Sequence, residues 1–268
     1  MKFLLFSLIL FIRLANASES LSAANYSIVQ EKINQIRTTH PQDEILIVSD
    51  FDNTLMKPMH LLGSDQFYEW QAHLMKTNDK SKDFETFDEF MEFHAKAMQL
   101  TKMTLTDPEI PAMINAWKDN NIHMIVLTSR GPFFRSITER DLRLQGLNIR
   151  DLNPVKDFIE ETKIQERDAH FMNGLFFTSG LHKGEALHHF LQKTNKNYKH
   201  IIFIDDMEKH TKNVFEHFTT HQDLKEKINI ITIRYSREDP AKEYFLKNAK
   251  KAKKEIKAFK NFLKTHFP

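Results

Sequence analysis

Four apolar runs, each long enough for one buried β-strand, lie along this sequence with helical patterns between them. The runs span residues 45–48, 122–127, 200–204 and 228–233. Continuous apolar runs of this length are typical of strands covered on both faces, and their alternation with helices is typical of a parallel sheet. We therefore expect an α/β fold, with a Rossmann-like parallel sheet flanked by helices.

The segments between these runs carry apolar residues at helical spacing. Helices are predicted at residues 26–38, 107–118, 136–145, 184–194 and 208–221. A different pattern occurs within residues 170–177, where Asn173 and Gly174 separate two short apolar segments. Because Asn-Gly is a strong signal for a two-residue turn, we expect a β-hairpin there.

Residues 57–105 match no strand of the predicted sheet. They are rich in Phe, Met, His and charged residues, and an apolar stripe recurs near helical spacing at Phe84, Phe87, Met91, His94 and Met98. Such a stripe is typical of the packing face of a small helical unit. We expect a small helical cap, residues 57–105, inserted after the first strand of a core formed by residues 18–56 and 106–268.

The first 17 residues have the pattern of a signal peptide. Lys2 gives a positive start, residues 3–12 form an apolar run, and residues 15–17 are small enough for cleavage. This pattern predicts a bacterial protein that is exported to the periplasm or secreted. Arg13 leaves an uncleaved N-terminal anchor as the alternative. No later stretch approaches the roughly 20 apolar residues that cross a bilayer, so no stable membrane insertion is expected.

Charge and cysteine content exclude several function classes. Without residues 1–17, which include Lys2 and Arg13, the chain has 36 basic and 36 acidic residues. This balance gives no global field for nucleic acid, so no nucleic-acid partner is predicted. The sequence contains no cysteine, which excludes thiol catalysis and disulfides.

Polar residues that could take part in catalysis or ligand binding follow the predicted strands. They are Asp50 to Thr54 after the first, Thr128 to Gly131 after the second, Lys183 at the start of a helix, and Asp205 with Asp206 after the third. Each group taken alone has an ordinary explanation as a turn, a helix cap or a surface charge. However, parallel strands gather their carboxyl ends at one edge, where such folds bind ligands. Adjacent carboxylates such as Asp205 and Asp206 also repel each other unless a cation is present.

The order of these motifs resembles that of the haloacid dehalogenase (HAD) superfamily, over about residues 45–235. There is some likeness to its secreted acid phosphatases and to an uncharacterised exported bacterial branch. A receiver domain uses similar residues, but its acidic pair comes first and its lysine last. The resemblance to HAD enzymes implies a phosphatase, a Mg²⁺-dependent phosphomonoester hydrolase that acts on a small phosphorylated substrate through an aspartyl-phosphate.

The resemblance also implies a role for each motif residue. Asp50 would be the nucleophile, and Asp52 would donate a proton to the leaving group and later accept one from water. Lys183 would offset negative charge around Asp50. The Mg²⁺ ligands would be Asp50, the backbone carbonyl of Asp52, Asp205 and Asp206, the last acting through bound water.

The phosphoryl group would be held by Thr128, by the backbone amides around Phe51 and Ser129, and by Arg130. For Arg130 a structural ion pair is an equal alternative. His182 and His210, which adjoin motif residues, are expected to be bystanders.

Two questions about function stay open in the sequence. The same aspartates serve phosphotransferases and phosphomutases, and an exported HAD-like protein can also be a non-catalytic binding protein. A second open feature is the C-terminal stretch, where an apolar helical stripe is surrounded by nine lysines between Lys242 and Lys264. We expect a helix that packs on the catalytic core, the alternative being contact with an anionic membrane surface or a partner.

Overall fold

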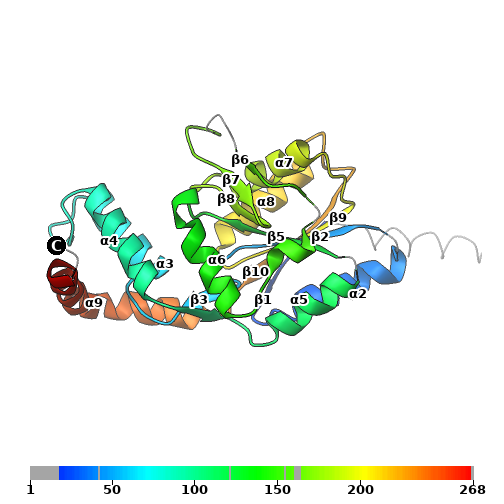
Figure 1. Ribbon diagram of the computed structural model, residues 1–268. Helices are drawn as coiled ribbons and strands as arrows, with labels where there is room; N and C mark the ends of the chain where they lie inside the picture. Colours follow the sequence, from blue (N-terminus) through cyan, green and yellow to red (C-terminus); the bar gives the residue numbers. More distant parts are fainter. Residues whose placement is uncertain (1–17, 42, 121, 154, 160–163, 267–268) are drawn as a thin grey trace, which may run out of the picture.

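The structure, a computed structural model, describes residues 18–266 except 42, 121, 154 and 160–163. The predicted signal peptide lies outside the described residues. Within them, eight strands form one sheet in the order β1-β10-β9-β2-β5-β8-β7-β6 (Figure 1). The strands are β1 (Glu19–Ala23), β2 (Ile45–Ser49), β5 (His123–Thr128), β6 (Phe158–Ile159), β7 (His170–Met172), β8 (Leu175–Phe177), β9 (His200–Asp205) and β10 (Asn229–Tyr235).

The strands from β1 to β8 in that order pair in parallel, and β7 and β6 add antiparallel pairs at one edge. The four predicted strands correspond to β2, β5, β9 and β10. The predicted hairpin is present as β7 and β8, with Asn173 and Gly174 at positive φ in the turn. Strand β1 was not predicted, because its sequence ESLSA has no apolar run and it lies at the edge beside β10.

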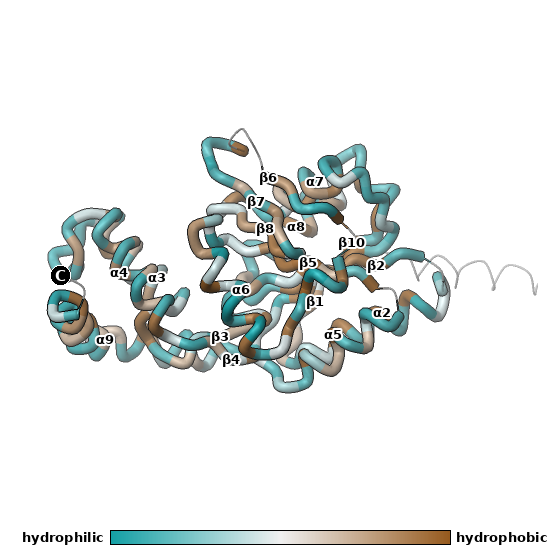
Figure 2. The backbone as a smooth tube through the Cα atoms, in the orientation of Figure 1, coloured by the Kyte–Doolittle hydropathy of each residue, from teal (hydrophilic) through white to brown (hydrophobic). Residues whose placement is uncertain are grey.

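Helices cover both faces of the sheet. They are α2 (Ile28–Thr39), α5 (Ile110–Asp119), α6 (Arg135–Leu144), α7 (Lys183–Thr194) and α8 (Glu208–Thr220). Alternate strand residues face opposite layers: Ile45 and Ile47 pack with α2 and α5, whereas Leu46 and Val48 pack with α7 and α8. The hydrophobic segments therefore gather in the sheet (Figure 2). This confirms the expected α/β, Rossmann-like class, with a parallel sheet flanked by helices.

The helical cap follows β2, as expected. It is entered and left through a short antiparallel pair, β3 (Met56–Pro58) and β4 (Met103–Leu105). Between these strands lie α3 (Asp65–Lys76) and α4 (Phe87–Leu100). Each helix begins with a hydroxyl N-cap, Ser64 or Thr86, whose side chain accepts an N–H bond from the first turn.

The C-terminal helix α9 (Asp239–His266) packs mainly on this cap. Its Phe245 and Ile256 are buried in one cluster with Phe67, Phe84 and Phe93 of the cap region. The expectation that the helix packs on the catalytic core is therefore wrong for most of its length. A helical stripe identifies which face is apolar, but it does not identify which surface covers that face.

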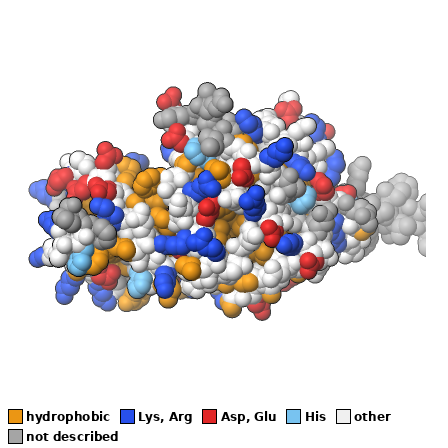
Figure 3. Space-filling view, viewed as in Figure 1, with side chains coloured by type: hydrophobic (Ala, Val, Ile, Leu, Met, Phe, Trp, Pro, Cys, Tyr) orange, Lys and Arg blue, Asp and Glu red, His pale blue; other side chains and the backbone are white. Residues whose placement is uncertain are grey.

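Basic side chains line the outer edge of the lobe formed by α3, α4 and α9 (Figure 3). Some lysines of α9 bind the cap rather than solvent alone: Lys260 contacts Glu89 at 3.0 Å and lies over the ring of Phe84. Within the described part of the chain, no helix combines the length and the apolar character that crossing a bilayer needs.

Candidate active site

The carboxyl ends of the central strands bring three of the predicted motifs to one edge of the sheet. Asp50 directly follows β2, Thr128 ends β5 and Asp205 ends β9. The register fixes this proximity, because Ser49 of β2 lies opposite Ile204 of β9 and the Asp50 amide donates to the Ile204 carbonyl at 2.9 Å. Parallel pairing alone therefore places these side chains together.

Lys183 joins two of the aspartates. Its Nζ lies 2.5 Å from Asp50 Oδ1 and 2.5 Å from Asp205 Oδ2, and all three side chains are buried. Burial opposes the ammonium charge, but Asp205 and Asp50 outweigh it and raise the pKa of Lys183. Lys183 is therefore a charged group in the interior. Of the site residues predicted from the sequence, Lys183 is one that the structure brings to Asp50.

The two carboxylates beside Lys183 differ in their electrostatics. Burial would raise the pKa of Asp205, but Lys183 and a hydrogen bond from His210 hold it well below its usual range. Burial raises the pKa of Asp50 well above its usual range; Lys183 opposes this rise, and the negative charges of Asp205 and Asp206 add to it. A single lysine therefore faces two buried carboxylates, those of Asp50 and Asp205.

Asp206 completes a cluster of three buried carboxylates. Its backbone N–H donates to Thr54 Oγ1 at 2.9 Å, and its side chain forms an ion pair with Lys242 of α9. Burial and the neighbouring Asp205 raise its pKa to about 6. Each of Asp50, Asp205 and Asp206 offers an oxygen within 4.8 Å of the others. An all-oxygen, electron-rich set of this kind fits a hard divalent cation such as Mg²⁺.

Asp52 turns to a different partner, Arg130. Arg130 Nε and Nη2 donate to the two carboxylate oxygens of Asp52 at 2.8 and 2.7 Å. The guanidinium also donates to Thr138 Oγ1 at 2.9 Å and lies 4.4 Å from the centre of the Phe51 ring. Of the two readings that the sequence left open for Arg130, the described contacts show the ion pair.

The loop after β2 sets the direction of Asp52. Residues 51–56 form a tight turn in which the amides of Leu55 and Met56 donate to the Phe51 carbonyl. Asn53 adopts a φ of 57°, a left-handed conformation that Asn tolerates better than most residues. Its side-chain oxygen accepts a hydrogen bond from Gln66 of the cap at 2.9 Å.

Thr128 and Ser129 lie in the second predicted motif. Thr128 is buried and its Oγ1 accepts the backbone N–H of Arg130 at 3.1 Å, while Ser129 is exposed. The Thr128 carbonyl accepts from Thr178, which leads into the loop before Lys183. These bonds hold the second and third motifs against each other.

Several site residues have no sequence signal of their own. Lys242 is one of nine similar lysines, and Gln66 and His94 come from the cap. His94 is buried, its Nδ1 has no hydrogen-bond partner among the described residues, and burial together with Arg130 lowers its pKa to about 4. Asp65 also belongs here, because burial, with Asp52 and Glu69 nearby, raises its pKa.

His210 and His182, the two histidines next to motif residues, have different partners in the structure. His210, which we expected to be a bystander, lies within the site, with its Nδ1 3.2 Å from both carboxylate oxygens of Asp205. His182 is the N-cap of α7 and accepts the N–H of Glu185. Their positions in the sequence are alike, and only the side-chain partners in the folded protein show that His210 contacts a site carboxylate and that His182 caps a helix.

Comparison with solved structures finds two HAD-like proteins among those similar to this chain. A haloacid dehalogenase-like hydrolase from Streptococcus pneumoniae is 14% identical, with a TM-score of 0.39, over 70% of this chain and 93% of that one. The HAD domain of effector protein Lem4 from Legionella pneumophila is 13% identical, with a TM-score of 0.38, over 77% and 95%. A comparison with curated proteins finds no match. The family model described as "Protein of unknown function (DUF2608)" matches residues 24–268.

Proposed function

The chain belongs to the DUF2608 family, and we propose that it is a phosphatase, a Mg²⁺-dependent phosphomonoester hydrolase that forms an aspartyl-phosphate on Asp50. One observation carries the proposal: the buried Lys183 ammonium lies 2.5 Å from both Asp50 and Asp205. A buried lysine is costly unless it is paired, so its position indicates a site built around anionic groups. Attack by one anion on another requires such local positive charge.

The carboxylates of Asp50, Asp205 and Asp206 would hold the Mg²⁺, together with the backbone carbonyl of Asp52. The bound ion would offset the negative charge of the carboxylates and of the phosphoryl group. Support for this set is that burial, with the negative charge of the neighbouring Asp205, raises the pKa of Asp206 to about 6, which a bound cation would oppose. Each of the three side chains is buried and close enough to share one ion.

In the first step, a carboxylate oxygen of Asp50 forms a bond to phosphorus and the bond from phosphorus to the ester oxygen breaks. Asp52 gives its proton to the departing oxygen. In the second step Asp52 takes a proton from water, the water oxygen bonds to phosphorus, and the bond to Asp50 breaks. Phosphate is released and both aspartates return to their starting forms. Because Arg130 binds both oxygens of Asp52, one of these bonds must open for each proton transfer.

The remaining motif residues would position the substrate. Thr128 and the amides around Phe51 and Ser129 lie at the strand ends beside Asp50 and would bind phosphoryl oxygens. Arg130 would act chiefly by orienting Asp52. The substrate would be a small phosphorylated molecule, and the N-terminal pattern supports a role outside the cytoplasm, in the periplasm or secreted.

Phosphate release from an aryl phosphate tests the proposal, with and without Mg²⁺. We expect Mg²⁺-dependent turnover by the wild type and none above background by Asp50→Asn. Asp119→Asn is the matched control, because this aspartate is exposed at the end of α5. Activity that survives Asp50→Asn contradicts the nucleophile, and a protein without turnover contradicts the hydrolase. Turnover that appears only with an acceptor alcohol identifies a phosphotransferase instead.

A further inference from the structure

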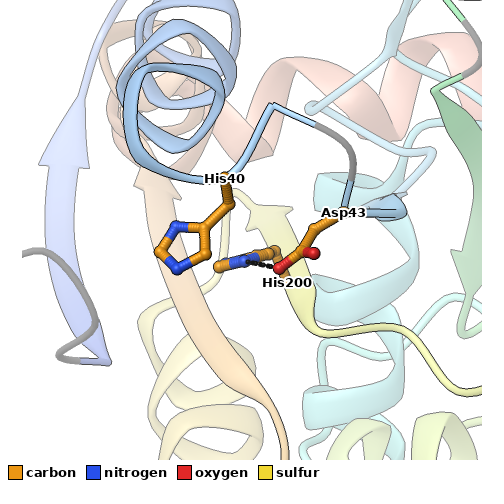
Figure 4. A group of neighbouring side chains, drawn as sticks. All are labelled: His40, Asp43 and His200. Carbon is orange, nitrogen blue, oxygen red and sulfur yellow. Dashed lines mark hydrogen bonds and ion pairs between the residues drawn. The ribbon is translucent and has the colours of Figure 1, made fainter.

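A second cluster of potential ligands lies at the opposite end of the sheet. It consists of His40 after α2, Asp43 before β2 and His200 at the start of β9 (Figure 4). Strand β9 begins at His200 and ends at Asp205, so five residue steps of about 3.3 Å separate the two sites by roughly 16 Å. The cluster is therefore independent of the aspartates at the carboxyl ends.

The three side chains converge. His200 Nε2 lies 3.1 Å from Asp43 Oδ2, and the rings of His40 and His200 are 4.9 Å apart between centroids. One ligand atom from each residue lies within 4.8 Å of the others. Ligands at about 2.1 Å from a tetrahedral zinc ion are about 3.4 Å apart, so rotation of the half-buried side chains of His40 and Asp43 would close the set. His40 Nδ1 is already engaged by the Thr39 hydroxyl at 2.8 Å, which leaves Nε2 as its ligand atom.

An unpartnered atom next to the cluster is a further sign of a metal site. Asn229 contacts His200 Nδ1 through its side-chain amide at 3.4 Å, and its Oδ1 is buried with no hydrogen-bond partner among the described residues. Rotating a carboxamide by 180° exchanges its oxygen and nitrogen without changing the space that the side chain occupies. With the oxygen toward the ring, Oδ1 accepts a hydrogen bond from the His200 Nδ1–H, and the Nε2 lone pair then faces the Asp43 carboxylate. Two acceptors at 3.1 Å need either a proton on Nε2 or a metal ion that both atoms bind.

The surroundings leave room for such an ion. The three residues line a surface pocket of about 310 Å³, so a fourth position is open to water. Lys199, Lys225 and Lys227 line the same pocket, but all three are exposed, and solvent screens their charges. Glu226 adds a carboxylate to the same rim.

We infer that His40, Asp43 and His200 bind one Zn²⁺ ion, with Asn229 orienting the ring of His200. Two imidazoles and one carboxylate suit zinc, whereas Mg²⁺ prefers oxygen ligands. The ion ties the loop after α2 to the start of β9. Histidines that bind metals commonly donate their second ring N–H to a neighbouring oxygen. Here the acceptor would be Asn229 Oδ1.

Calorimetric titration of the chelator-treated chain with Zn²⁺ tests the inference, with excess Mg²⁺ present to occupy the catalytic carboxylates. We expect one ion per chain, with affinity reduced about 100-fold or more in His40→Ala and in Asp43→Ala, and about 10-fold in Asn229→Ala. His217→Ala is the matched control, because this histidine contacts His188 on another face, at 3.0 Å. Its affinity should equal that of the wild type.

Substitution by Co²⁺ gives a second readout, since tetrahedral Co²⁺ with imidazole ligands absorbs strongly in visible light. Circular dichroism of His40→Ala separates loss of a ligand from loss of the fold. Absence of zinc binding, or unchanged binding in His40→Ala, overturns the inference. Phosphatase activity does not enter this test, so a chain that binds zinc without hydrolysing esters retains the zinc site and loses only the proposed function.

Discussion

Arg130 binds both carboxylate oxygens of Asp52, through Nε at 2.8 Å and Nη2 at 2.7 Å. A two-point contact fixes the plane of the carboxylate as well as its position. Asp52, the residue proposed to transfer protons, is therefore oriented by Arg130, which follows the neighbouring strand β5.

Arg130→Lys keeps the positive charge but loses the two-point contact with the Asp52 carboxylate. We expect kcat to fall about 10- to 100-fold, because a carboxylate that rotates freely meets the leaving oxygen less often. The loss should be larger for an alkyl phosphate, whose leaving group needs a proton, than for an aryl phosphate. Steady-state rates on both esters measure it, with the exposed Arg150→Lys as control. Equal losses on the two esters would show that Arg130 does not act through Asp52.

Asp52→Asn removes the group that is proposed to accept a proton from water. An aryl phosphate leaves without a proton, so we expect Asp50 to become phosphorylated and the second step to stall. Turnover should fall about 10²- to 10⁴-fold. Intact-protein mass spectrometry should detect one added phosphoryl group, which the double variant Asp50→Asn/Asp52→Asn lacks. A variant that slows without any covalent adduct contradicts this division of roles.

Lys242→Met leaves Asp206 buried without its ion-pair partner. Breaking a buried pair in this way should lower the free energy of unfolding by about 3 kcal/mol. Added Mg²⁺ should stabilise the variant more than the wild type, because the ion supplies the missing positive charge. Urea unfolding with and without Mg²⁺ measures both effects. The control is Lys247→Met, whose pair with Glu243 is exposed and should contribute less than about 0.5 kcal/mol. Equal stabilisation of variant and wild type by Mg²⁺ argues against a cation at Asp206.

Burial of His94 should make the fold sensitive to mild acid. Its pKa falls from 6.5 to about 4 on folding, so between these values the unfolded chain binds a proton that the folded chain does not. Stability is then complete above pH 6.5 and falls as the pH drops toward 4, by up to about 3 kcal/mol. His94→Phe should flatten this dependence, while His60→Phe, at an exposed position, should preserve it. Unfolding by urea at pH 7 and pH 4.5 measures how much the free energy of unfolding changes between the two pH values. An identical change in His94→Phe and in the wild type would exclude His94 as the cause.

Phe245 and Leu246 are neighbours on α9 with opposite environments, 4% and 67% exposed. Phe245→Ala should destabilise the protein by about 3 kcal/mol or more, because it opens a cavity among the cap aromatics. Leu246→Ala should change stability by less than about 0.5 kcal/mol. Chemical unfolding of both variants tests the docking of α9 on the cap, and similar effects at the two positions would contradict it.

Much of the fold and of the site could be predicted from the sequence, because both depend on strands that are recognisable as continuous apolar runs. Asp50 and Asp205 end apolar runs, so their meeting follows from parallel pairing. Strand β1 gave no such signal, since an edge strand of polar residues is not distinguished from a loop.

The sequence by itself determined which strands the motif residues follow, the helical character of the segment after β2 and the apolar face of α9, because hydrophobic periodicity is a local property. Only the tertiary structure decided the partners of the charged groups: Arg130 with Asp52, Lys242 with Asp206, and His40 with Asp43 and His200. These residues are separated by 36 positions or more in most of these contacts, and many similar charges compete for each. Which pair forms depends on where packing leaves two side chains within reach, and a local pattern carries no information about that.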